Sequence, residues 1–230
     1  MDFSSFFKQY EALVQQADAI FERVKQVHGE CVCCKEGCAD CCHALFDLTL
    51  VEALYIKSKF DAHCVEEARS ELIERANEAD RHIYRLKRQA FKEHEEGRSE
   101  EQILEEMAAH RVRCPALNAD NRCAIYEYRP LTCRIYGIPT VIGGKAHTCG
   151  LSAFNPGEQY PTVKMDAIYQ RLYEISLALA QAIDSRYPGL SDMLVPLSMA
   201  LLTDYTEEYL GVRNKEDGDA ETSEKRSEQG

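Results

Sequence analysis

Cysteine is the residue whose number and spacing most clearly indicate chemistry in this sequence. The chain has 11 cysteines in 230 residues, and six of them fall in one short stretch, CVCCKEGCADCC at 31–42. Four more follow at Cys114, Cys123, Cys133 and Cys149. Thiols placed so close together can form disulfides, take part in redox chemistry or bind a metal.

The composition of the chain bears on the choice among these chemistries. A formal net charge of −12 disfavours nucleic acid or an anionic membrane surface as a partner. No stretch approaches the roughly 18 to 20 apolar residues of a membrane span, and residues 1–16 lack the basic start and apolar middle of a secretory signal. We therefore expect a cytoplasmic protein, in which clustered thiols bind metal or act in catalysis more often than they form disulfides.

The cysteines, apart from Cys64, fall where the helical pattern is missing. Thiolates from Cys38 and Cys41, in a C-x-x-C turn, could share one ion with thiolates from the distant segment and so hold that segment in place. Adjacent side chains in an extended chain diverge, so Cys41 and Cys42 should serve two centres, or only one of them is a ligand. Ten thiols exceed the four that one centre needs, so two centres, or one centre with a redox pair, are both open.

The stretch YRPLTCRIYG at 128–137 predicts a short helix that begins at Pro130 and ends near Gly137. Cys133 would then lie in an early turn beside Arg134, and both the helix start and the cation favour the thiolate. Arg129 and Arg134 could bind an anionic substrate or donate hydrogen bonds to nearby carbonyl groups and sulfurs.

Other residues near the cysteines have weaker claims to a role in the site. His43 and His147 lie beside cysteines, but thiolates are in surplus, so we expect both imidazoles outside the coordination shell. Cys64 is expected to be a small buried apolar residue or an idle surface thiol.

Apolar residues at helical spacing predict the elements that position these cysteines. We expect a mainly α-helical single domain over residues 1–210, with its cysteine core at 30–152 and a disordered acidic tail at 211–230. The predicted helices cover residues 2–29, 48–60, 61–94, 99–111, 162–186 and 196–210.

Residues 112–160 lack a helical period, and a loop of this length inside a domain requires something to pin it. The stretch TVIGGKAHT at 140–148 predicts a small hairpin, because Gly143 and Gly144 suit the positive φ angles of a two-residue turn.

Two blocks of the sequence resemble a known family. GCADCC at 37–42, RCPALNADNRCAIYEYRPLTCRIYG at 113–137 and CGLS at 149–152 are similar to the YkgJ-type cysteine-cluster proteins, which are described as carrying a zinc- or iron-chelating C-x-x-C-x-x-C-C domain. Three residues separate Cys34 from Cys38 where the family motif has two, so Cys31 or Cys33 could replace Cys34. The resemblance implies these metal ligands: Cys34, Cys38, Cys41, Cys42, Cys114, Cys123, Cys133 and Cys149.

The spacing also bears on the kind of metal and on the function. One C-x-x-C pair and several widely separated single cysteines suit an iron–sulfur cluster of the 4Fe–4S type somewhat better than structural zinc, which usually has two short-spaced pairs. We expect a redox or metal-handling module with metal ions and a redox or protein partner. The alternative is a protein-modifying enzyme, because flagellin lysine N-methylases contain a similar cysteine cluster.

Overall fold

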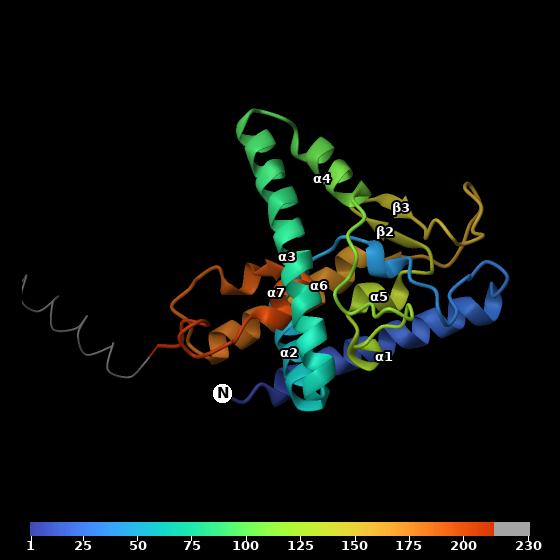
Figure 1. Cartoon of the computed structure of the whole chain (residues 1–230). Coiled ribbons are helices and arrows are strands. Elements are labelled where there is room, and N and C mark those ends of the chain that lie inside the picture. Colours follow the sequence, from blue (N-terminus) through green and yellow to red (C-terminus); the bar gives the residue numbers. More distant parts are fainter. Residues whose placement is uncertain (214–230) are drawn as a thin grey trace, which may run out of the picture.

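Seven α-helices form most of residues 1–213, the part of the chain that the computed structural model describes (Figure 1). The protein is therefore mainly α-helical, as the sequence predicts. The helices are α1 (Ser4–Val27), α2 (Leu50–His63), α3 (Glu66–Glu95), α4 (Glu100–Ala109), α5 (Leu131–Ile135), α6 (Met165–Ala182) and α7 (Leu197–Leu202).

Helix α2 lies at the centre of the fold and contacts α1, α6 and α7. Every residue from Leu50 to Lys57 is buried, so the first half of this helix has no solvent-exposed face. Its first turn is held by the Glu52 carboxylate, whose Oε2 accepts hydrogen bonds from the N–H and the hydroxyl of Thr49.

Helices α3 and α4 form an arm whose far end extends away from the other helices (Figure 1). The first half of α3 packs on α7 through Leu72, Ala76 and neighbouring apolar residues, whereas its second half is mostly exposed. Ser99 caps α4 by accepting a hydrogen bond from the N–H of Gln102 at 3.4 Å.

The strands are short and lie at two edges of the helical body. Strands β2 (Thr140–Ile142) and β3 (Lys145–His147) form the predicted hairpin, with φ angles of 54° at Gly143 and 78° at Gly144. Strand β4 (Val163–Lys164) adds to β2 in parallel, and β1 (Leu48–Thr49) pairs with β5 (Leu194–Val195) in antiparallel. These last three strands were not predicted, because two residues are too few to show a strand period.

Two predicted helices are shorter in the structure. The helix predicted at 196–210 ends at Leu202. There the hydroxyl of Thr203 donates a hydrogen bond to the carbonyl oxygen of Met199 at 2.8 Å, and the chain continues in turns. The helix predicted at 162–186 begins only at Met165, since the residues before it belong to β4, and it ends at Ala182.

The predicted acidic tail lies almost entirely in residues 214–230, outside the described residues. Before that point the N–H of Arg186 donates to the carbonyl oxygen of Gly211 at 2.7 Å, and Val212 pairs with Ser185. Within residues 1–213, no helix is both long enough and apolar enough to cross a membrane.

Candidate metal centre

Five cysteines from separate parts of the chain line one cavity of about 50 Å³. Its other walls are mainly apolar and include Phe46, Ile83 of α3, Ile125 and Leu197 of α7. The site is therefore enclosed by elements that are distant in sequence. The cavity cysteines, as we call them, are Cys41, Cys42, Cys114, Cys123 and Cys133.

Contacts between thiols link four of the cavity cysteines in a chain. Side-chain hydrogen bonds join Cys41 to Cys133 and Cys42 to Cys114, and a third joins Cys41 to Cys42. Cys41 and Cys42 lie in a 3₁₀ turn, Cys41–His43, rather than in an extended chain, so both thiols border the same cavity. The expectation that their side chains diverge is therefore wrong.

Burial and contacts between thiols raise the pKa values of Cys41, Cys42 and Cys123. The hydrogen bond with Cys133 lowers the pKa of Cys41, but the contact with Cys42 and burial raise it to about 12. The hydrogen bond with Cys114, followed by burial, raises the pKa of Cys42 to about 12, and burial raises that of Cys123 to about 11. These groups are neutral thiols near pH 7, so a metal that binds them as thiolates must displace protons.

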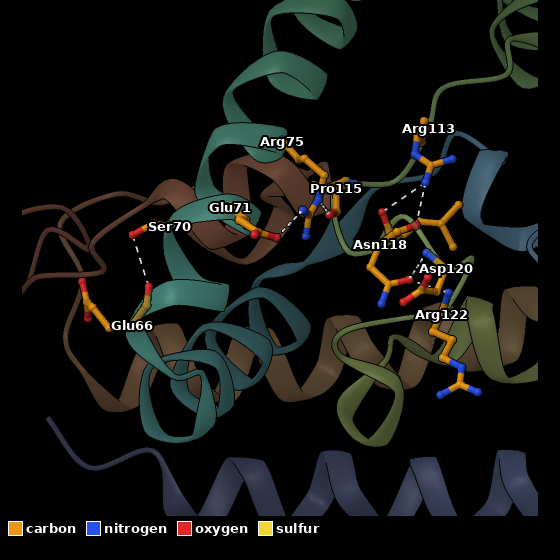
Figure 2. A network of polar contacts seen from close by, with 10 residues as sticks. Glu66, Ser70, Glu71, Arg75, Arg113, Pro115, Asn118, Asp120 and Arg122 are labelled. Atoms are coloured by element: carbon orange, nitrogen blue, oxygen red, sulfur yellow. Dashed lines mark hydrogen bonds and ion pairs between the residues drawn. The ribbon is translucent and has the colours of Figure 1, made fainter.

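Backbone hydrogen bonds hold the second cysteine segment against the first. The N–H of Cys114 donates to the carbonyl oxygen of Cys42 at 2.7 Å, and the N–H of Val112 donates to that of His43 at 3.1 Å. Figure 2 shows Arg75 of α3 donating to the carbonyl oxygen of Pro115 at 2.9 Å. The irregular segment is thus fixed on both sides of Cys114 by ordinary protein contacts.

The loop between Cys114 and Cys123 is closed by an asparagine. The Oδ1 atom of Asn118 accepts hydrogen bonds from the N–H groups of Asp120 and Arg122, at 3.1 and 2.8 Å (Figure 2). Asn121 adopts a φ of 57°, which asparagine tolerates better than most residues. This turn brings Cys123 back to the cavity that Cys114 also borders.

Helix α5, which carries Cys133, begins at a buried carboxylate. The Oε1 atom of Glu52 accepts a hydrogen bond from the N–H of Leu131, the first residue of the helix, at 3.2 Å. Burial raises the pKa of Glu52, although its hydrogen bonds from Leu131 and Thr49 oppose that shift. Glu52 therefore links the start of α2 to the start of α5 and sets the position of Cys133.

Arg134 donates hydrogen bonds to nearby carbonyl groups, which is one of the two roles that the sequence suggests for it. Its buried guanidinium donates to Asp18 at 2.7 Å and to the carbonyl oxygens of Arg129 and Glu127 at 3.0 and 2.6 Å. The pKa of Cys133 is raised well above its usual value, first by its hydrogen bond with Cys41 and then by burial. The direction of this shift is opposite to the one that the helix start and Arg134 would cause.

The other three predicted ligands, Cys34, Cys38 and Cys149, lie outside the cavity. The Cys149 thiol donates to Oδ2 of Asp40 at 3.4 Å, and Asp40 is paired with Arg111 at 2.6 Å. Burial raises the pKa of Cys34 to about 11, and the neighbouring Cys38 and Cys149 add to the shift. The eight predicted ligands thus divide into five that share the cavity and three beside it.

The remaining cysteines and histidines have other surroundings. Cys31 is buried in the hydrophobic core, whereas Cys33 is exposed. Cys64 follows α2 and is half-buried. His43 Nδ1 lies 2.9 Å from the carbonyl oxygen of Ala39, and His147 is exposed on β3.

The cavity cysteines do not form a preassembled site for a single ion. Within residues 1–213, no three His, Cys, Asp or Glu side chains form a group that could hold a single metal ion. All eleven cysteines are free thiols, so the cavity cysteines remain available as ligands. Sequence reasoning missed the cavity walls supplied by α3 and α7, since their apolar residues look like any other core residues.

Comparison with known proteins gives one match. A family model described as "CxxCxxCC: Putative zinc- or iron-chelating domain" matches residues 30–150, more than half of the chain. No curated protein and no solved structure matches. The matched range contains all the cavity cysteines as well as Cys34, Cys38 and Cys149. The chain belongs to this CxxCxxCC family.

Proposed function

We propose that the cavity cysteines bind an iron–sulfur cluster of the 4Fe–4S type, and that the protein is a cytoplasmic redox or metal-handling module. The observation that carries this proposal is the single apolar cavity that five thiols from separate segments line. A family described as zinc- or iron-chelating supports the metal, and free thiols suit the reducing cytoplasm.

Two features favour a cluster over a single zinc ion. Structural zinc usually takes its donors from two short-spaced pairs, whereas the cavity cysteines combine one adjacent pair with three single residues from separate segments. The apolar walls supplied by Phe46, Ile83 and Leu197 would limit the access of water, which is one way in which a protein sets the properties of a cluster.

Cys34, Cys38 and Cys149 lie outside the cavity, so any metal that they bind would form a second centre. Cys149 already contacts the Asp40 carboxylate, whose ion pair with Arg111 fixes it in place. The cavity supplies enough thiols for one cluster without them.

Anaerobic purification followed by metal, sulfide and visible-absorption analysis tests the proposal. We expect a brown protein that contains iron and acid-labile sulfide. A colourless protein with stoichiometric zinc and no sulfide would contradict the cluster, and cysteines found as disulfides in freshly isolated protein would contradict metal binding altogether.

A matched pair of substitutions tests the cavity itself. Cys133→Ser removes a thiol that contacts Cys41 inside the cavity, so the metal content per chain should fall by at least half. Cys64→Ser changes a thiol at the end of α2, away from the cavity lining, and should leave the metal content unchanged. Equal metal content in both variants would show that the cavity is not the site.

A further inference from the structure

Arg129 borders the cavity in a fixed position without being a possible metal ligand. It follows the 3₁₀ turn Tyr126–Tyr128 and precedes α5. Its guanidinium carbon lies 3.9 Å from the centre of the Tyr126 ring, and Nη1 donates to the carbonyl oxygen of Tyr126 at 2.9 Å. Stacking and hydrogen bonding on one residue thus hold this cation at the rim of the cavity.

The other arginines near the cavity are committed to other partners. The guanidinium of Arg113 donates to the carbonyl oxygens of Leu117 and Asn118 at 3.4 and 2.8 Å (Figure 2). Arg134 is bound by Asp18 and by backbone carbonyl groups. Arg129 donates only to the Tyr126 carbonyl among the hydrogen bonds of the described residues, and it forms no ion pair within residues 1–213.

The charge of Arg129 acts on thiols at the cavity. Arg129 lines the same cavity as Cys123 and Cys133. When metal displaces the thiol protons, the site gains several thiolates and a net negative charge. A cation held at the rim would stabilise that charge by direct Coulomb attraction.

We propose that Arg129 is a dedicated counter-charge for the metal–thiolate centre: it strengthens metal binding and raises the reduction potential of a bound cluster without coordinating the metal. The inference rests on the proposed function of the cavity. The potential rises because reduction adds negative charge to the centre, and net charge near a cluster is one determinant of its potential.

Zinc affinity measured by competition with a chromophoric chelator provides the first test, on the full chain in reduced form. Arg129→Gln should weaken Zn²⁺ binding about tenfold, as outer residues of metal sites commonly do. Arg129→Lys keeps the charge and should stay within about threefold of the unaltered protein. Arg171→Gln removes the same charge from an α6 side chain that is paired with Glu174 and does not line the cavity, and this variant should bind zinc normally.

Salt and electrochemistry separate a counter-charge from a structural role. Arg129 is partly exposed to solvent, so added salt should screen its charge and narrow the difference in Zn²⁺ affinity between Arg129→Gln and the unaltered protein. In protein carrying a reconstituted cluster, Arg129→Gln should lower the reduction potential, whereas Arg171→Gln should not.

The outcomes distinguish this inference from the proposed function. If the unaltered protein binds metal but Arg129→Gln binds it equally well, or Arg171→Gln weakens metal binding just as much, the counter-charge is refuted and the metal site stands. If Arg129→Lys weakens Zn²⁺ binding as much as Arg129→Gln does at every salt concentration, the side chain acts through packing. The inference is then also refuted. If the unaltered protein binds neither zinc nor a cluster, both proposals fail.

Discussion

Gly137, just after α5, should be intolerant of any side chain because Cys34 occupies the space beside it. A Cβ atom built on Gly137 would lie 2.1 Å from the Sγ of Cys34 and 3.5 Å from the Phe21 ring. Ordinary contacts begin at about 3.4 Å, so Gly137→Ala must displace either the Cys34 thiol or the end of α5 by more than an ångström.

The cost of this clash can be isolated by a second substitution. Overpacking of a buried site typically costs 1 to 3 kcal/mol, and we expect Gly137→Ala to lower the free energy of unfolding by about 2 kcal/mol. In a Cys34→Ala background, the nearest atoms are Cβ of residue 34 at 3.6 Å and the Phe21 ring, both in ordinary contact. Gly137→Ala should there cost less than about 0.5 kcal/mol, which leaves a coupling energy of roughly 1.5 kcal/mol.

Urea unfolding of the four proteins in the double-mutant cycle, each reduced and metal-free, measures that coupling. Circular dichroism reports the transition, and equal slopes with respect to urea are required for a valid comparison. If the two substitutions are additive within about 0.4 kcal/mol, the Cys34 thiol does not pack against Gly137 as described.

Two further predictions concern the groups that position the cavity thiols and their protons. Glu52→Ala should lower the free energy of unfolding, measured by urea titration, by about 3 kcal/mol, because the N–H groups of Leu131 and Thr49 lose a buried acceptor. A change below about 1 kcal/mol would contradict the link between α2 and α5. The affinity for Zn²⁺ should rise steeply from pH 6 to pH 8. The pKa values of Cys41 and Cys42 are about 12, so zinc must displace protons from these thiols when it binds. An affinity that does not change with pH in chelator competition would exclude thiolate ligation.

The elements with strong local signals could be predicted from the sequence. In α1, Tyr10, Ala17 and Val24 recur at helical spacing and are buried in the structure, and the hairpin of β2 and β3 turns at Gly143 and Gly144 as expected. The two cysteine regions could also be recognised, because thiol spacing is visible without any knowledge of the fold. In each case the residues that determine the local structure lie within a few positions of one another in the sequence.

The division of the cysteines could not be predicted, because it depends on contacts between distant segments. The 3₁₀ turn that places Cys41 and Cys42 at one cavity has no periodic signal. Cys31 and Cys34 are three residues apart, yet one is in the core and the other packs against Gly137. Arg134 follows Cys133 directly, but its charge is held by Asp18 on α1, a helix more than a hundred residues earlier in the chain.

These long-range contacts also bear on how metal and fold are related. In a classical zinc finger the metal supplies the energy of folding, because few other contacts hold the ligand segments together. Here the N–H of Cys114 donates a hydrogen bond to the carbonyl oxygen of Cys42, and the Glu52 carboxylate accepts one from the first N–H of α5. The ligand segments are therefore assembled by the fold itself. A metal bound in this cavity would add to the stability of the protein in proportion to the logarithm of its free concentration, as any ligand of the native state does.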